Sequence, residues 1–128
     1  MLDSYALLAF LFEESGHHKV VSRLDRALAE DRPALVASPT WAEVRSMVER
    51  RLGAARWPEA RRVLLGLPID IVAADQSLAE AAGELKATKP MSLADCFAAA
   101  LARQRGADIY TGDPEFKAVQ KDIKIVWL

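Results

Sequence analysis

Two aspartates in the second half of the chain stand where short structural elements meet, a common place for reactive groups. Asp95 follows Ser92 at the start of an apolar series with helical spacing, which Gly106 ends. Asp113 follows a short apolar run and precedes Pro114, a residue suited to the first turn of a helix. No basic residue lies three or four positions from Asp95, so its charge has no local partner on the helix.

Each of these aspartates also has a purely structural interpretation. Ser92 and Asp95 have the spacing of a capping box, with Asp in place of the usual Glu. Asp113, directly before Pro114, is a good helix N-cap. Taken one at a time, both interpretations stay open, and the choice depends on whether other acids reach the same place.

Asp3 and Glu43 are two further acids at expected element boundaries. Asp3 ends a very short apolar segment and precedes an apolar run, residues 4–12, that reads as a buried helix. Glu43 borders the apolar stripe of a helix predicted over residues 40–52, and no basic residue lies three or four positions away. An exposed glutamate with a distant partner is the alternative for Glu43.

The elements that would position these acids alternate between strand and helix. Short apolar runs predict strands over residues 1–3, 33–37, 69–73, 107–111 and 123–128. Helical spacing and capping signals predict helices over residues 4–12, 17–31, 40–52, 57 to about 66, 75–85, 92–106 and 114–121, with Ser38 and Asp75 as caps. Strands separated by helices predict an α/β fold, a parallel sheet of about five strands with helices on both faces.

In such a sheet, ligands bind beyond the carboxyl ends of the strands, so the four acids can converge on one pocket there. Four carboxylates together repel one another unless cations compensate, and hard divalent metals prefer oxygen ligands. The residues therefore indicate a Mg²⁺ or Mn²⁺ site and metal-assisted phosphoryl transfer.

Composition limits the alternatives. A chain of 128 residues with 52% hydrophobic content fits a single domain, residues 1–128. A net charge of −1 excludes a strongly basic protein that wraps nucleic acid. The single cysteine, Cys96, falls on an apolar helix face and is expected in the core. No apolar run approaches a membrane span and no signal peptide is recognised, so we expect a cytoplasmic protein without membrane contact.

Six arginines lie between residues 45 and 62, interrupted by Glu49 and Glu59. Most runs of this kind are solvated helix faces with internal Glu–Arg pairs. The sharper hypothesis is a surface that contacts RNA phosphates, with Arg50 and Arg51 as its centre.

Four short segments together resemble a known family. They are Leu2-Asp3-Ser4, Trp41-Ala42-Glu43-Val44, Ser92-Leu93-Ala94-Asp95 and Thr111-Gly112-Asp113-Pro114-Glu115-Phe116. In this order they resemble a PIN domain of the kind found in VapC-type toxin ribonucleases of toxin–antitoxin systems. One departure is that Tyr5 is bulkier than the residue the family more often has there.

The resemblance implies a three-layer PIN-like fold and a metal-dependent endoribonuclease. It implies that Asp3, Glu43, Asp95 and Asp113 form the acidic quartet and that Thr111 supports it. Asp3, Asp95 and Asp113 are then the expected ligands of Mg²⁺ or Mn²⁺, and Glu43 could instead orient the attacking water. Ser4 stands where the family has a supporting hydroxyl. The implied partners are an RNA substrate, a small antitoxin and a second copy of the chain.

Two alternatives of other classes stay open. A haloacid-dehalogenase-like phosphatase also begins with an Asp after its first strand, but it requires a second Asp two positions later, where this chain has Tyr5. A non-enzymatic α/β binding module would use the same acids only as helix caps. Metal-dependent cleavage of RNA would separate all three.

Overall fold

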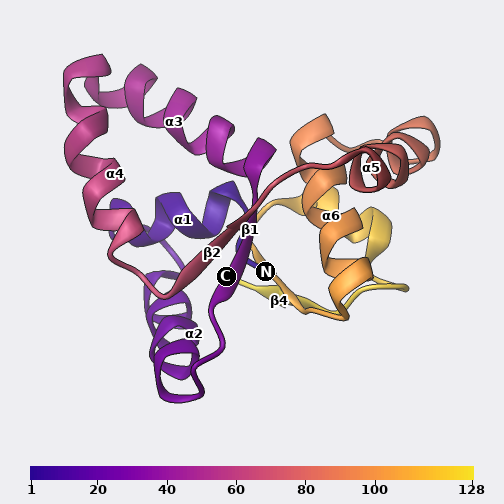
Figure 1. Ribbon diagram of the computed structural model, residues 1–128, viewed down its shortest axis with the longest axis horizontal. Helices are drawn as coiled ribbons and strands as arrows, with labels where there is room; N and C mark the ends of the chain where they lie inside the picture. The colour runs from indigo at the N-terminus through magenta and orange to yellow at the C-terminus, as the bar shows by residue number, and fades with distance from the viewer.

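Two groups of helices enclose a central set of short strands in the computed structural model, which describes residues 1–128 (Figure 1). The helices are α1 (Ser4–Leu11), α2 (His17–Ala29), α3 (Ser38–Leu52), α4 (Trp57–Leu65), α5 (Gln76–Thr88) and α6 (Leu93–Arg105), with 3₁₀ turns η1 (Ala54–Arg56) and η2 (Pro114–Val119). The strands are β1 (Ala34–Ala37), β2 (Ile69–Val72), β3 (Ile109–Thr111) and β4 (Ile125–Trp127). The predicted α/β sandwich with a parallel sheet is confirmed.

The sheet has fewer strands than predicted. β1 pairs with β2 and β3 pairs with β4, both in parallel, so the four strands form two pairs. The segment before α1 was predicted as a fifth strand, but only Leu2 forms a bridge, to Tyr110. The reason is its length, because α1 begins at Ser4 and leaves three residues before it.

This short segment nevertheless joins the two pairs. The amide of Leu2 donates to the carbonyl of Leu35 at 2.9 Å, and the amide of Tyr110 donates to the carbonyl of Met1 at 3.0 Å. The spatial order is therefore β2, β1, the first residues, β3 and β4. The chain leaves the centre toward one side and later returns to the other, which makes the end of the first segment the switch point where α/β sheets bind ligands.

Each face of the strands carries its own apolar core. One core joins α5, α6 and η2 to the sheet, and its largest fully buried side chains include Phe116, Met91 and Leu101. The other joins α1, α2, α3 and α4 to the opposite face, around residues such as Leu7, Val44 and Leu64. The figure shows these two helical groups on either side of the strands (Figure 1). Helices on both faces fit short strands that are apolar along nearly their whole length.

Several local predictions can be compared with the structure. Asp75 caps α5 as predicted, since its side chain accepts from the amide of Leu78 at 2.8 Å, and Cys96 is buried in the core. Ser38 was predicted as an N-cap, but it is already the first residue of α3. Its hydroxyl instead accepts from the amide of Ala74 at 3.1 Å, which fastens the chain after β2. The predicted last helix is the 3₁₀ turn η2.

Candidate functional site

Asp3 lies at the switch point of the sheet and is almost completely buried, with 1% of its surface exposed. Its Oδ1 accepts from the amide of Ala6 at 2.8 Å and so caps α1. Its Oδ2 is buried without any hydrogen-bond partner. Burial raises the pKa of Asp3 from 3.8 to about 7, and the nearby carboxylates of Asp95 and Asp113 add to the rise. An unpaired buried carboxylate oxygen is costly and requires a partner that the protein itself does not supply.

Asp95 lies in the first turn of α6, a helix that begins where the serine cap predicted it would. The amide of Asp95 donates to the Ser92 hydroxyl at 3.2 Å, and that hydroxyl donates to Asp95 Oδ2 at 2.7 Å. Burial raises the pKa of Asp95 to about 6, partly offset by the Ser92 hydroxyl. The carboxylates of Asp113, Glu43 and Glu115 raise the pKa of Asp95 further.

Asp113 follows β3 and caps η2. Its Oδ1 accepts from the amide of Glu115 at 2.8 Å, and its own amide donates to the hydroxyl of Thr111 at 2.8 Å. Thr111 is fully buried, and its hydroxyl also lowers the pKa of Asp3. Thr111 is therefore positioned between two of the acids, where it can hold the turn that carries Asp113.

The acids identified in the sequence converge. Asp3, Asp95 and Asp113 are close enough to affect one another's ionisation, and Glu43, half-buried on α3, acts on Asp95. Asp3 ends the central segment, Asp113 follows the neighbouring strand, and Glu43 and Asp95 come from helices that start at the same edge. The sequence reasoning missed a fifth acid, Glu115, whose Oε2 accepts from the amide of Ser92 at 2.6 Å. Glu115 belongs to the last of the four motifs, which was the available signal.

The three aspartates share a design that reconciles the two interpretations of the sequence. Each uses one oxygen to cap or brace the start of its helix, while its second oxygen accepts no hydrogen bond from the protein. The caps fix the carboxylates at helix N-termini, where the partial positive charge favours an anion. Capping therefore orients these carboxylates and leaves part of each available for a ligand.

The donors of this cluster fit a hard divalent cation in chemical type. All of them are carboxylates, which Mg²⁺ and Mn²⁺ prefer, and the orphaned Oδ2 of Asp3 is a ready ligand position. The raised pKa values of Asp3 and Asp95 reflect burial and mutual repulsion, both of which a cation would relieve. As the side chains stand, no three of them are drawn close enough together to hold one ion. Adjustment of carboxylate rotamers would have to bring them together.

The predicted supporting residues are distributed differently. Ser4, directly after Asp3, is half-buried at the start of α1. Arg50 and Arg51 are exposed near the end of α3, about 10 Å along the helix from Glu43. The Arg51 guanidinium is engaged by Glu14 at 2.7 Å and lies over the ring of Phe12.

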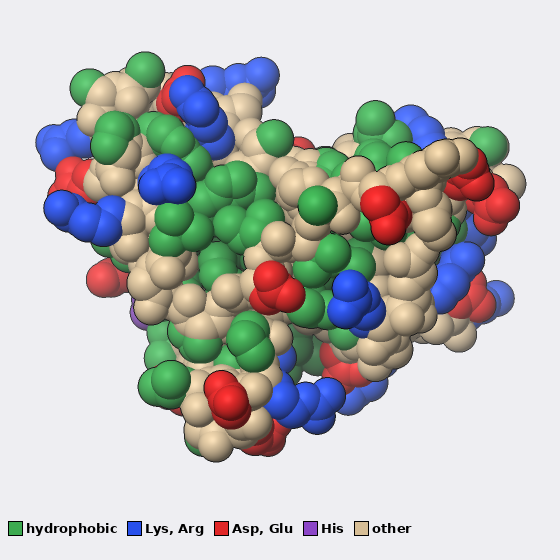
Figure 2. Space-filling model, viewed as in Figure 1, with side chains coloured by type: hydrophobic (Ala, Val, Ile, Leu, Met, Phe, Trp, Pro, Cys, Tyr) green, Lys and Arg blue, Asp and Glu red, His purple; other side chains and the backbone are tan.

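The other arginines of this segment are partly paired as well. Arg45 pairs with Glu49 at 2.8 Å, and Arg56 pairs with Glu59 at 3.2 Å. Figure 2 shows basic side chains spread over the outer surface of α3 and α4, with acidic ones among them. These pairs match the solvated-face interpretation, while Arg50 has no ion-pair partner and stays available.

None of the helices is both long enough and apolar enough to cross a membrane.

Comparison with known proteins adds a family and a fold. The family model described as PIN domain matches residues 1–122. No curated protein matches the chain. Among solved structures, VapBC2 from Rickettsia felis bound to a promoter DNA fragment aligns with a TM-score of 0.76 and 16% identity, over 98% of this chain and 96% of that one.

Two further solved structures are similar. DNA-bound VapBC from Salmonella typhimurium aligns with a TM-score of 0.75 and 20% identity, over 98% of this chain and 95% of that one. VapC20 from Mycobacterium tuberculosis, described as a toxin that cleaves the sarcin–ricin loop, aligns with a TM-score of 0.70 and 19% identity, over 92% of both chains. At such identities the likeness establishes the fold, and together with the family match over residues 1–122 it shows that this chain belongs to the PIN-domain family.

Proposed function

We propose that the chain is a metal-dependent endoribonuclease and the toxin of a toxin–antitoxin pair. The observation that carries the proposal is the buried Asp3, whose Oδ2 has no partner in the protein and which lies beside two further carboxylates. A site that concentrates negative charge in this way is suited to hold Mg²⁺ or Mn²⁺.

In this proposal Asp3, Asp95 and Asp113 are the metal ligands. The bound metal would supply a Lewis acid that polarises a phosphodiester and lowers the pKa of water. Glu43, half-buried at the same edge, orients the attacking water. Thr111 holds the turn before Asp113 through its 2.8 Å contact with the amide of that residue, and Ser4 supports the first turn after Asp3.

RNA is the substrate we favour for two reasons. The structurally similar VapC20 is described as a toxin that cleaves the sarcin–ricin loop, which is RNA. The unpaired guanidinium of Arg50 can contact a phosphate, whereas Arg51 would first have to leave Glu14. The membership of the PIN family removes the haloacid-dehalogenase-like phosphatase from consideration.

An antitoxin is the partner we propose, because the similar structures from Rickettsia felis and Salmonella typhimurium are VapBC assemblies. Exposed apolar side chains that such a partner could cover lie on α3 and α4, namely Leu52, Val63 and Leu65. A homodimer, one domain spanning residues 1–128 and a location in the cytoplasm stay predictions from the sequence.

Cleavage of RNA tests the proposal directly. The purified chain is incubated with a structured RNA and Mg²⁺ or Mn²⁺, and the fragments are mapped. We expect discrete cuts that chelator abolishes and that Asp113→Asn abolishes. Asp75→Asn is the matched control, because Asp75 also caps a helix but lies outside the cluster. Equal cleavage by all three proteins, or no metal-dependent cleavage by any, would leave the acids as helix caps in a binding module.

A further inference from the structure

A cavity of about 570 Å³ lies at the edge of the sheet opposite the acids. Its walls include Met1 and Leu35, near the starts of the central segment and β1, and Asp108 and Tyr110, at the start of β3. The acids occupy the other ends of the same strands, so the cavity is separate from the proposed nuclease site. Its volume falls in the range of small-molecule sites.

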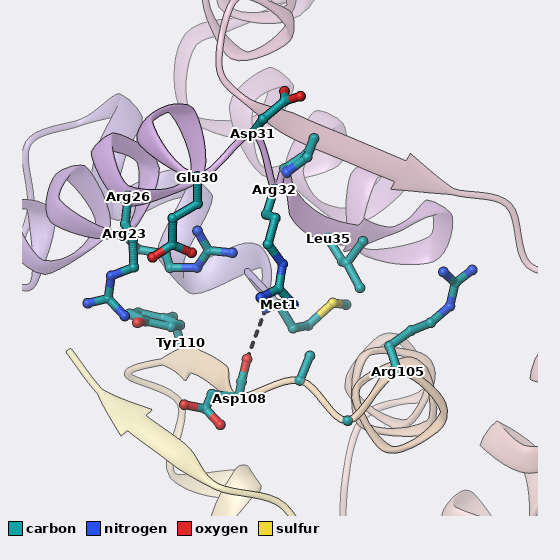
Figure 3. Close-up of a pocket in the computed structure, with 13 residues that line it drawn as sticks. Met1, Arg23, Arg26, Glu30, Asp31, Arg32, Leu35, Arg105, Asp108 and Tyr110 are labelled. Atoms are coloured by element: carbon teal, nitrogen blue, oxygen red, sulfur yellow. Dashed lines mark hydrogen bonds between the residues drawn. The ribbon is translucent and has the colours of Figure 1, made fainter.

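Four arginines from three parts of the chain line this cavity. Arg23 and Arg26 come from α2, Arg32 precedes β1, and Arg105 ends α6. Figure 3 shows Arg32 extending into the middle of the cavity, with Arg23 and Arg26 on one side and Arg105 on the other. None of the four takes part in an ion pair, although three of the arginines on α3 and η1 do.

The acids around the cavity do not balance these charges. Asp108 is engaged by Lys124 at 2.7 Å, and Asp31 points away from the cavity in Figure 3. Glu30 is the one remaining carboxylate at the rim. Four guanidinium groups therefore meet one free carboxylate in a hollow with protein walls, an arrangement that concentrates positive potential.

We propose that this cavity binds a phosphate-bearing anion with two or more adjacent phosphate groups. Guanidinium groups are matched to phosphate oxygens because they donate in bidentate pairs. Arginines that converge on one hollow from three elements fit a compact polyanion better than an extended acidic peptide, which would call for a row of charges along a groove. The phosphates could belong to a free nucleotide or to an RNA chain, and the shared chemistry is the same. The inference does not depend on the proposed nuclease activity.

Titration with inorganic pyrophosphate tests the site in the metal-free protein at fixed ionic strength. NMR signals of the arginine side chains and of backbone amides around the cavity report binding. We expect saturable shifts there, with at least tenfold weaker binding in the double variant Arg32→Gln, Arg105→Gln. Both residues are exposed, so the fold should be retained, and thermal melting checks this.

The matched control is the double variant Arg61→Gln, Arg62→Gln, which removes two exposed and unpaired arginines of α4. It should bind pyrophosphate as the parent does. Parallel titrations with ADP and with a short single-stranded RNA identify the source of the phosphates, and either ligand at the cavity supports the site.

Three outcomes would overturn the proposal. They are absence of saturable shifts at the cavity, equal weakening in the control variant, and preference for a poly-glutamate peptide over both pyrophosphate and RNA.

Discussion

Replacing Asp95 by Asn should stabilise the metal-free protein, an unusual result for a buried residue of a folded domain. The pKa of Asp95 rises from 3.8 to about 6, first through burial and then through Asp113, Glu43 and Glu115. The unfolded chain therefore ionises Asp95 near pH 4 while the folded chain holds its proton until about pH 6, so ionisation opposes folding at every pH above that window.

The magnitude follows from this difference. At about 1.4 kcal/mol for each pH unit, a pKa of about 6 in place of 3.8 corresponds to a ceiling of about 3 kcal/mol at pH 8. Solvent screening at the open edge of the sheet reduces this to about 1–2 kcal/mol. Asn can still accept from the Ser92 hydroxyl, but it loses about 0.3–1 kcal/mol of favourable charge at the start of α6. The net expectation is a gain of about 1 kcal/mol, or about 3–5 °C in Tm.

Thermal melts of parent and Asp95→Asn in chelator, at pH 8 and pH 4, measure this effect. The gain should be present at pH 8 and absent at pH 4, where the aspartate is protonated in the folded chain. Asp75→Asn is the control, since Asp75 caps α5 in the same way without facing other acids, and its Tm should change little. Equal or lower stability of Asp95→Asn at pH 8 would refute the idea that carboxylates repel one another here.

Three further predictions concern the same end of the molecule. Because burial raises the pKa of Asp3 from 3.8 to about 7, urea melts in chelator should show the free energy of unfolding falling by up to about 4 kcal/mol between pH 4 and pH 8, and Asp3→Asn should flatten this slope. Gly112→Ala would place its Cβ 2.4 Å from the ring of Tyr5, so RNA cleavage should fall at least tenfold, and adding Tyr5→Ala should restore much of it; an additive double variant would show that the ring is not the cause. Replacing Arg50 and Arg51 with Ala should lower the salt slope of RNA binding by about one for each phosphate that the protein no longer neutralises, with Arg50 giving the larger share because Arg51 is paired with Glu14, and an unchanged slope would return both to the solvated face.

The acidic cluster could be predicted from the sequence because its residues mark element boundaries. Aspartates that cap helices are visible as such in a sequence, and strand–helix alternation places their helices at one edge of a parallel sheet. Asp3, Glu43, Asp95 and Asp113 were all identified in this way, and the structure brings them together.

Other features depend on tertiary contacts that leave no local pattern. The first three residues are too few to show strand periodicity, and their role in joining two strand pairs comes from hydrogen bonds to distant segments. Glu115 reads as an ordinary first-turn acid until its contact with the amide of Ser92 is seen. The arginines of the opposite cavity are up to 82 positions apart in the sequence, from Arg23 to Arg105, and only the fold collects them.

Binding of Mn²⁺ to the acidic cluster tests the central claim most directly, because it does not require knowledge of the RNA target. Electron paramagnetic resonance of free Mn²⁺ during titration gives the number of sites and the affinity. The parent should bind at least one ion, and Asp3→Asn and Asp113→Asn should each weaken that binding at least tenfold, while Asp75→Asn binds as the parent does. Undiminished Mn²⁺ binding in both site variants, or no binding by the parent at millimolar Mn²⁺, would contradict the assignment of these carboxylates as the metal centre.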